Sequence, residues 1–335
     1  MAAEMAEQPD VLARLIERRS AVAGVLGGCI PDPLHGIVLV ARGSSDHAAV
    51  YGRYVLETAT GKPVGLAAPS LHTLYRVPAD YRRILVVGIS QSGRTPEIVT
   101  VLERLKAAGA ATLAVTNDVS SPLAQVGDAV VDLGAGSEEA VPATKTFTAT
   151  VAVLAFLAEA LGRVPWSGDQ WKRVPEAVSE ALADDAPPRH AAGVIGDAGG
   201  LVVVARGFLF GVALEAALKL KEAAAVLAQG YSAADLLHGP IAVVEEDFPV
   251  VLLHVPGPTA ADVAELVATL RHRGAEVLRV APDPHAELPV PGDLPEALAA
   301  FPVAVRAQQL AHALALHRGL DPDRPPGLTK VTPTT

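Results

Sequence analysis

The sequence lacks three features that would each mark a class of protein: paired cysteines, an excess of basic residues and a long apolar run. Its one cysteine, Cys29, excludes an intramolecular disulfide and a cysteine-rich metal site. Lysine and arginine total 27 against 37 aspartate and glutamate residues, and this net charge of −10 argues against nucleic acid or an anionic membrane as a partner. The longest apolar helical stretch, about residues 148–161, is too short to cross a bilayer.

What the sequence does contain is enough aliphatic material for sizeable cores. The chain has 335 residues, of which 50% are hydrophobic, and a mean hydropathy of +0.33. This length predicts about two domains, and the composition excludes intrinsic disorder. The acidic start of the chain lacks the apolar segment of a signal peptide, so we expect a soluble cytoplasmic protein.

A repeat of two glycine-bounded aliphatic segments organises the chain. Residues 36–43 read Gly-Ile-Val-Leu-Val-Ala-Arg-Gly, and residues 200–207 read Gly-Leu-Val-Val-Val-Ala-Arg-Gly. Each has the continuous apolar character of a strand buried on both faces of a parallel sheet, and each precedes a helical pattern, over 46–57 and 212–227. The alternative is a chance similarity between two generic buried strands.

Further strands alternate with helices along both halves. Strand patterns of the same kind recur at 83–89, 111–115, 129–133, 248–254 and 276–280. Strands that alternate with helices in this way indicate right-handed βαβ units. The predicted fold class is therefore α/β, with two tandem doubly wound parallel-sheet subdomains related by internal duplication.

Changes in composition suggest the domain boundaries. A helix over 11–26 precedes the first half, and a polar helix near 171–183, followed by a Pro187-Pro188 stop, separates the halves. The predicted parts are an N-terminal helical segment (1–33), a first subdomain (34–165), a connecting helix and linker (166–199), a second subdomain (200–319) and a C-terminal tail that closes over the site (320–335).

Small and hydroxyl-bearing residues follow the strand at 83–89. The segment 88–95 reads Gly-Ile-Ser-Gln-Ser-Gly-Arg-Thr and precedes a helical pattern over 96–108. Its hydroxyl groups and the free N–H groups of a helix N-terminus suit a phosphate. Binding of this kind needs no large basic patch, so it is compatible with an acidic protein. An ordinary N-capping turn, with Thr95 as the cap, is the alternative.

Two serines, Ser44 and Ser45, follow the first strand. Ligands of open α/β sheets lie at the carboxyl ends of the strands, although Ser45 fits a helix cap equally well. At the matching place of the second half, residues 255–259 carry no serine. A true repeat therefore predicts that only the first half binds phosphate.

Acidic and basic residues share one face of a predicted helix in the second half. Glu215, Lys219 and Glu222 are spaced i, i+4 and i+7, the pattern that a proton transfer between neighbouring sugar carbons needs. The alternative is a solvent-exposed helix with Glu–Lys pairs, although the flanking residues are strongly apolar. His238, in a His-Gly-Pro turn, is either a proton donor or a turn histidine.

Two other polar segments carry candidate residues. In the loop 138–146, Thr144 or Thr146 is expected to cap the apolar helix that follows. Lys330 lies on the predicted tail, where it either folds over a site or is solvated.

Taken together, these segments resemble the sugar isomerase (SIS) domain proteins, and among them the isomerase half of glucosamine-6-phosphate synthase and the type II glucosamine-6-phosphate deaminases. The resemblance covers roughly residues 10–332 and implies flavodoxin-like subdomains. The motifs that carry it are Arg-Gly-Ser-Ser-Asp-His (42–47), Ile-Ser-Gln-Ser-Gly-Arg-Thr (89–95), Ala-Thr-Lys-Thr (143–146), Leu-Glu-Ala-Ala-Leu-Lys-Leu-Lys-Glu (214–222), His-Gly-Pro (238–240) and Leu-Thr-Lys-Val-Thr (328–332).

The resemblance implies a phosphate site in the first half of the chain. The 88–95 loop matches the family's phosphate loop, and Ser45 matches the serine that completes it, with Ser44 beside it. Val141 and Ala143 match positions near the sugar. The implied binding residues are Ser44, Ser45, Ser90, Gln91, Ser92, Thr95, Val141 and Ala143.

The resemblance also implies the catalytic groups. Glu222 matches the glutamate that moves a proton between C1 and C2, and Lys219 and Glu215 match residues that line that site. His238 matches a histidine that opens the sugar ring from the neighbouring subunit, which implies a homodimer. Lys330 matches a tail lysine that forms an imine with the open-chain ketose. The family's chemistry implies no metal and no cofactor.

Several positions depart from the synthase pattern. Ala2 stands where the synthase has its glutaminase cysteine, so we expect no glutaminase domain. Ala143 stands where the synthase has a serine, and Arg94 replaces the usual acid of the phosphate loop. Gln229 and Asp235 also differ. These departures resemble the deaminase and deglycase members of the family.

We therefore expect an enzyme that converts glucosamine 6-phosphate and water into fructose 6-phosphate and ammonia, by ring opening and C1–C2 proton transfer. The expected partner is a phosphorylated amino sugar or ketose. One alternative is an isomerase or deglycase for another 6-phosphosugar, such as a fructosamine or galactosamine phosphate. The other is a non-catalytic sensor of a sugar phosphate.

Overall fold

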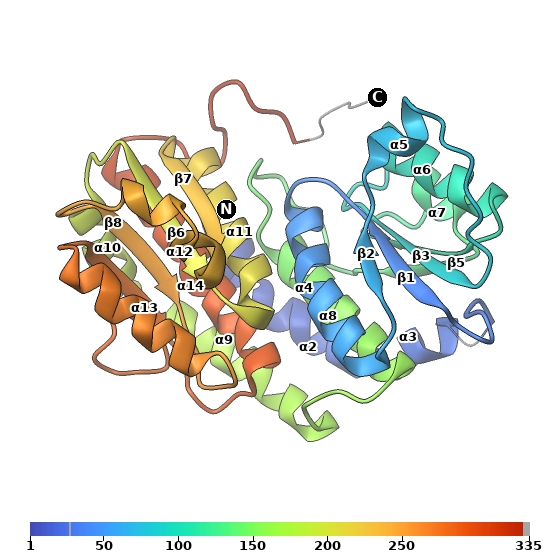
Figure 1. Ribbon diagram of the computed structural model, residues 1–335, viewed down its shortest axis with the longest axis horizontal. Helices are drawn as coiled ribbons and strands as arrows, with labels where there is room; N and C mark the ends of the chain where they lie inside the picture. Colours follow the sequence, from blue (N-terminus) through green and yellow to red (C-terminus); the bar gives the residue numbers. More distant parts are fainter. Residues whose placement is uncertain (27, 331–335) are drawn as a thin grey trace. The chain divides into compact units, whose positions relative to one another are not determined.

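The structure is a computed structural model that describes residues 1–26 and 28–330. The chain forms two compact units, each built around one parallel sheet (Figure 1). The N-terminal unit contains residues 11–138 and 145–165, with 329 and 330, and the C-terminal unit contains residues 1–10, 139–144 and 166–328. The first ten residues and the loop 139–144 thus belong with the second half, which no motif in the sequence indicates.

The N-terminal unit has a five-stranded parallel sheet in the order β2-β1-β3-β4-β5. In its register, Leu39 lies opposite Leu66 on one side and Val87 on the other. The strands are β1 (Gly36–Val40), β2 (Val64–Leu66), β3 (Ile84–Ile89), β4 (Ala111–Thr116) and β5 (Ala129–Asp132). The order changes direction between β1 and β3, and the loops that follow these two strands therefore flank the position where sheets of this kind bind ligands.

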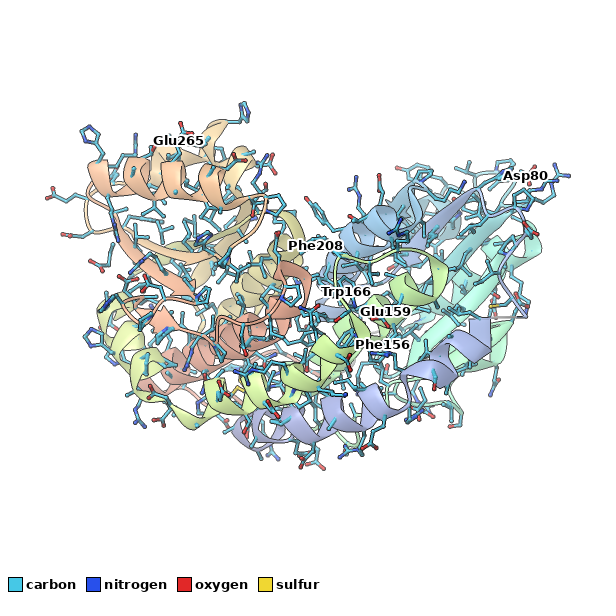
Figure 2. The ribbon with its side chains drawn as sticks, turned by 90° about the horizontal axis from the view of Figure 1, so that it is seen from below. Asp80, Phe156, Glu159, Trp166, Phe208 and Glu265 are labelled. Atoms are coloured by element: carbon cyan, nitrogen blue, oxygen red, sulfur yellow. The ribbon has the colours of Figure 1, made fainter. Side chains whose placement is uncertain are left out.

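Helices cover both faces of this sheet: α3, α4 and α8 lie on one face, and α5, α6 and α7 on the other (Figure 1). Their bounds are α3 (Arg19–Leu26), α4 (Ser44–Thr60), α5 (Pro69–Thr73), α6 (Pro96–Ala107), α7 (Pro122–Val126) and α8 (Lys145–Leu161). Helix α8 is buried along most of its length, which explains why its sequence is apolar all round. Figure 2 shows its Phe156, which is buried, and its Glu159, which pairs with Arg19 at 3.3 Å.

The C-terminal unit repeats this topology. Its parallel sheet has the order β10-β9-β8-β6-β7, so β7-β6-β8-β9-β10 corresponds to β2-β1-β3-β4-β5. The strands are β6 (Gly200–Ala205), β7 (Leu227–Ser232), β8 (Pro249–Leu253), β9 (Glu276–Ala281) and β10 (Leu288–Pro289). The predicted pair of doubly wound sheets is therefore confirmed, and the shared strand order is what a duplication produces.

In the C-terminal unit, α12 and α13 pack on one face of the sheet, and α10, α11 and α14 on the other. The elements of this unit are α1 (Ala2–Ala6), η1 (Gly168–Lys172), α9 (Arg173–Ala183), α10 (Ala186–Ile195), η2 (Gly207–Leu209), α11 (Phe210–Ala224), α12 (Ala233–Leu237), η3 (Pro240–Val243), α13 (Ala260–His272) and α14 (Glu296–His317). Among the described residues, no helix combines the length and the apolar character needed to cross a membrane.

Three local predictions were wrong. The helix expected over 11–26 is two helices, α2 (Gln8–Glu17) and α3, because the amide of Arg18 bonds to the carbonyl of Leu15 in a tighter turn. The helix expected to reach residue 227 ends at Ala224, since Ala225 has a left-handed backbone (φ 50°), and β7 follows.

The third error concerns the proline pair at 187–188. These prolines do not stop a helix but lie in the first turn of α10, where their missing N–H groups have no intrahelical partner to lose.

Candidate active site

The loop between β3 and α6 is organised by its own hydroxyl groups. The Oγ of Ser90 accepts a hydrogen bond from the amide of Gly93 at 3.2 Å and lies 3.3 Å from the Oγ1 of Thr95. The Oγ of Ser92 accepts the amide of Arg94 at 3.2 Å. Gly93 has a left-handed backbone, and a Cβ there would lie 2.0 Å from the Oγ of Ser121, so only glycine fits this turn.

The alternative interpretation of this loop, an ordinary capping turn, is only half correct. Thr95 is the N-cap residue of α6 and Pro96 the first helical residue, as that interpretation expects. However, the Thr95 side chain makes no capping hydrogen bond and instead faces Ser90. The hydroxyl groups of Ser90 and Thr95 are therefore turned toward each other at the start of α6.

The serines after β1 lie at the same edge of the sheet as this loop, because β1 and β3 are parallel neighbours. Helix α4 begins at Ser44 and its N-cap is Gly43, so the alternative interpretation, in which Ser45 caps the helix, is wrong. Both serines are half-buried. The structure thus brings together Ser44, Ser45 and the 88–95 loop at the point where the strand order changes direction.

Asn117 is a residue at this edge that the sequence analysis missed. It follows β4, and its amide donates to the carbonyl of Gln91 at 3.0 Å. Its side chain donates to the carbonyl of Gly136 and accepts the amide of Ala135, both at 2.8 Å. It therefore ties the 88–95 loop to the loop after β5. A polar residue directly after a buried strand was the signal that could have identified it.

An arginine–glutamate pair joins the loops that follow β1 and β3. Glu97, the second residue of α6, has a side chain that is 7% exposed, whereas Arg42 is 46% exposed. The Nε and Nη2 of Arg42 donate to the two carboxylate oxygens of Glu97 at 2.8 and 3.0 Å. This two-bond geometry is the strongest form of such a pair. Neither residue was predicted to be functional.

Arg94, which replaces the usual acid of the phosphate loop, extends along the exposed rim. Its guanidinium donates to the carboxylate of Asp118 at 2.9 Å. The pKa of Asp118 is lowered by hydrogen bonds from the side chain and amide of Ser120 and by the bond from Arg94. The positive charge of Arg94 is thus directed to the side of the loop.

In the C-terminal unit, Glu215, Lys219 and Glu222 lie along one face of α11, as their spacing predicted. The Lys219 side chain is 1% exposed, its Nζ lies 3.4 Å from the Oε1 of Glu215, and it also donates to the carboxylate of Glu222. Glu215 is as buried as the lysine, whereas the Glu222 side chain is 20% exposed. The alternative of a solvent-exposed Glu–Lys helix is therefore wrong.

The loop 139–144, which contains Val141 and Ala143, is fastened within the C-terminal unit. The buried carboxylate of Glu4 accepts the first two amides of this loop. The amide of Val141 donates to the carbonyl of Asp323 at 3.0 Å. Both predicted contact residues are half-buried. Segments from the two ends of the chain therefore position this loop.

His238 is exposed and forms the C-cap of α12, immediately before a Gly-Pro turn. Lys330 lies in the N-terminal unit, where its Nζ is 2.8 Å from the carboxylate of Glu138. The Glu138 side chain is fully buried and also accepts the amide and hydroxyl of Thr146 at 3.1 and 2.6 Å. Because α8 begins at Lys145, Thr146 lies inside the helix, whereas Thr144, the other predicted cap, directly precedes it. The imine role of Lys330 stays a prediction.

Within residues 1–26 and 28–330, no three histidine, cysteine, aspartate or glutamate side chains gather in a way that would hold a metal ion.

Comparison with known proteins identifies the family. The SIS domain matches residues 34–160 and 195–288, and the chain therefore belongs to the SIS domain family. It is 32% identical to the glutamine–fructose-6-phosphate aminotransferase (isomerizing) of Methanothermobacter thermautotrophicus, over 98% of this chain and 56% of the relative. The corresponding protein of Gloeobacter violaceus is 33% identical, over 98% and 58%. The chain thus spans little more than half the length of these relatives.

Solved structures agree with this assignment. A protein from Silicibacter pomeroyi DSS-3, named as a candidate phosphosugar isomerase, is 32% identical, with a TM-score of 0.84 over 96% of this chain and 99% of its own. The glucosamine-6-phosphate deaminase of Thermotoga maritima has a TM-score of 0.76 over 97% of this chain and 100% of its own. At 24% identity, this second likeness shows the fold alone.

Proposed function

We propose that this protein is an amino-sugar-phosphate isomerase and deaminase that converts glucosamine 6-phosphate and water into fructose 6-phosphate and ammonia. The observation that carries the proposal is the burial of Lys219 between Glu215 and Glu222, with only Glu222 open to solvent. Burial of a lysine with two carboxylates costs free energy that good packing of apolar residues would avoid. Such an arrangement is therefore better explained by proton chemistry than by stability.

Phosphate binding is assigned to the loop between β3 and α6. Ser90, Gln91, Ser92 and Thr95 supply hydroxyl and amide groups there, with Ser44 and Ser45 at the same edge of the sheet. Because the phosphate is remote from C1 and C2, its binding energy can hold the open chain in a reactive position. Val141 and Ala143 are assigned to contacts with the sugar.

Proton transfer is assigned to α11. After ring opening, the Glu222 carboxylate removes the proton from C2. The electron pair of that C–H bond forms a double bond between C1 and C2, and the C1–O double-bond pair moves to O1, which takes up a proton. Glu222 then returns its proton to C1 on the electron pair of the C1–C2 double bond, while the amino nitrogen forms a double bond to C2 and loses a proton, which leaves an imine at C2. Water adds to this imine and ammonia departs, so that C2 becomes the ketone of fructose 6-phosphate. Lys219 offsets the negative charge that develops on the substrate oxygen.

His238 is assigned to ring opening, in which it moves the O1 proton to the ring oxygen. Its exposed position on a turn suits a residue that acts from across a subunit interface. If it does, mixing Glu222→Gln with His238→Ala should restore about a quarter of the wild-type activity, because half of the dimers are mixed and each has one intact site. No recovery in a mixture of exchanging subunits would contradict the assignment to the partner subunit.

The test of the proposal is the formation of both ammonia and fructose 6-phosphate from glucosamine 6-phosphate. Glu222→Gln should form both products at least about a hundredfold more slowly while binding the substrate nearly as wild type does. Glu265→Gln, which changes the same kind of group at an exposed position of α13, is the matched control (Figure 2). Normal turnover by Glu222→Gln would exclude the mechanism.

A second candidate is an isomerase or deglycase for another 6-phosphosugar. Arg94 and Ala143, which replace an acid and a serine of the synthase pattern, favour a different sugar. If wild type is silent with glucosamine 6-phosphate, thermal shift with other phosphosugars should identify the ligand. Binding without turnover of any phosphosugar would instead indicate a sensor.

A further inference from the structure

Helix α14 carries two neighbouring glutamines that are both buried but bond in different directions. Gln308 is 1% exposed and Gln309 is 7% exposed. The side-chain amide of Gln309 accepts a hydrogen bond from Arg306 at 2.9 Å and donates to the carbonyl of Leu182, near the end of α9, at 3.4 Å. These bonds join α14 to a helix that carries no residue of the proposed site. Gln309 therefore serves the packing of two helices.

Gln308 instead faces residues that the proposed function uses. Its Nε2 donates to the carbonyl of Thr144 at 3.3 Å, at the end of the loop 139–144. Its Oε1 accepts from the Nε2 of Gln8 at 2.9 Å, and Gln8 is fully buried. An amide group has one accepting end and one donating end. The bond from Gln8 therefore fixes which end of Gln308 is turned toward the loop, and all these residues belong to the C-terminal unit.

The same side chain lies against the charged face of α11. A narrow enclosed space between α11 and α14, too small for a water molecule, is lined by Glu215 and Lys219 from one helix and by Gln308 from the other. The other side chains that line it are apolar: Val212, Ala216, Ala304 and Ala307. One glutamine therefore lies beside the Glu215–Lys219 pair and also bonds to the end of the loop that carries Val141 and Ala143.

The loop 139–144 is held on both sides of its proposed sugar contacts. On one side, the Glu4 carboxylate accepts the first two amides of the loop. On the other side, directly after Ala143, Gln308 holds the carbonyl of Thr144. The position of Ala143 relative to α11 therefore depends on Gln308, because α14, which carries Gln308, packs on α11.

We propose that Gln308 is a positioning residue, which holds the loop 139–144 in place relative to Lys219 and Glu222. The inference rests on the proposed function, in which this loop contacts the sugar and Glu222 moves its proton. A misplacement of about 1 Å, even by a change far from the chemistry, can cost about a hundredfold in rate. An apolar side chain of equal length would pack against α11 but would leave the loop without this bond.

The test compares Gln308→Met with Gln309→Met, the matched control. Methionine keeps the length of glutamine but cannot donate to a carbonyl. Gln308→Met should lower kcat for glucosamine 6-phosphate about ten- to a hundredfold. Inorganic phosphate should inhibit this variant as strongly as it inhibits wild type, because phosphate is assigned to the 88–95 loop. Gln309→Met should keep both wild-type values, although both variants lose stability.

Hydrogen exchange tests the contact without any substrate. The amides of the loop 139–144 should exchange faster in Gln308→Met than in wild type, whereas in Gln309→Met they should not. Faster exchange with a wild-type kcat would leave Gln308 a purely structural residue and would overturn the proposal. Unchanged exchange in Gln308→Met would overturn it as well.

A failure of the proposed function gives a different result. If wild type does not turn over glucosamine 6-phosphate, the probes are fructose 6-phosphate and inorganic phosphate, with binding measured by calorimetry. Gln308→Met should then raise the dissociation constant of fructose 6-phosphate about three- to tenfold, as expected for one lost hydrogen bond, and leave that of phosphate unchanged. An equal change for both probes, or no binding of fructose 6-phosphate by wild type, would overturn the inference too.

The contact with Gln8 supplies a second variant. Gln8→Met removes the bond that orients the Gln308 amide, so it should lower kcat in the same direction but less. Adding it to Gln308→Met should cost little more than Gln308→Met alone, because Gln8 acts through Gln308. If Gln308→Met does not fold, Gln8→Met, which leaves α14 unchanged, is compared with Gln309→Met instead. A loss of kcat as large in Gln309→Met would overturn the proposal.

Discussion

The two sheets of this chain have the same strand order but carry different chemistry at the same place. In the N-terminal unit, hydroxyl-bearing residues of the 88–95 loop gather where the strand order changes direction. In the C-terminal unit, the corresponding loops carry Gly207 and Gly257, and the side chain of Glu296 lies close to both. The comparison teaches that a duplicated fold keeps the backbone positions, whereas a few side chains decide which chemistry each position carries.

The helices that follow the first strand of each sheet differ in the same way. Helix α4 uses a small residue, Gly52, to pack closely against Leu39 and Leu154, and its buried face is apolar. Helix α11 instead buries Lys219 and Glu215. One copy of the repeat therefore serves packing and the other, in our proposal, serves proton transfer.

The largest effect should come from Glu222, the most exposed member of the charged face of α11. Glu222→Gln should lower kcat by about 10²- to 10⁴-fold, because the amide cannot carry a proton between C2 and C1. The dissociation constant for glucosamine 6-phosphate, measured by calorimetry, should change little. A large loss of binding with unchanged kcat would instead place Glu222 in substrate recognition.

The next effect should come from the phosphate loop, 88–95, which the second half does not repeat. Ser90→Ala and Thr95→Val each remove a hydroxyl from the phosphate loop and should raise KM about ten- to a hundredfold, since a hydrogen bond to a charged group contributes about 1.5–3 kcal/mol. Thr269→Val, at a half-buried position of α13 where the hydroxyl bonds to the carbonyl of Glu265, is the matched control. If Ser90→Ala and Thr95→Val raise KM no more than Thr269→Val does, the phosphate does not bind at this loop.

A smaller effect should come from the Arg42–Glu97 pair. Glu97 places a carboxylate at the start of the helix proposed to bind phosphate, and Arg42 neutralises it. Arg42→Ala should therefore weaken phosphosugar binding by about tenfold, and adding Glu97→Gln should restore most of it. The measurement is the dissociation constant of each variant.

The two single variants show whether Arg42 acts by neutralising the charge of Glu97 or only by holding the two segments together. If the pair only holds the two loops together, Glu97→Gln alone should weaken binding as much as Arg42→Ala does. Arg82→Ala is the control, because Arg82 makes the same kind of pair with Asp80 but precedes β3, at the opposite end of that strand. Asp80 lies at the outer edge of the N-terminal unit, with its side chain 59% exposed (Figure 2).

The smallest effect should be a pH dependence from Glu296. Burial raises the pKa of this carboxyl more than the nearby Phe208 amide and Thr259 hydroxyl lower it. The folded state therefore keeps the proton to a higher pH than the unfolded state does, so the group's stabilising contribution is present at acid pH and is lost as the pH rises through its folded pKa.

Urea unfolding of wild type and Glu296→Gln from acid to neutral pH measures this contribution. The free energy of unfolding of wild type, relative to the variant, should fall with rising pH by less than about 1 kcal/mol, since a half-buried group is partly screened. A difference that grows with pH would show that the two donors outweigh burial.

Much of the fold was predictable because its signals are local. The strands at 36–40, 84–89 and 200–205 are continuous aliphatic runs, and their likeness predicted the duplication. The 88–95 loop was recognisable from adjacent residues, and so was the stripe of Glu215, Lys219 and Glu222, because three and four residues make one helical turn. Strand β7 was missed, since its run from Leu227 to Ser232 contains polar residues and a glycine.

By itself, the sequence determined the two sheets, the loop of hydroxyl groups and the charged face of α11, since each depends on residues that are near in the chain. Only the tertiary structure decided that Glu4 fastens the loop 139–144, that Arg42 pairs with Glu97, and that the Glu296 carboxylate lies close to Gly207 and Gly257. Each of these contacts joins residues far apart in sequence. Such pairs carry no local period or spacing, and only the packing of the whole unit brings them together.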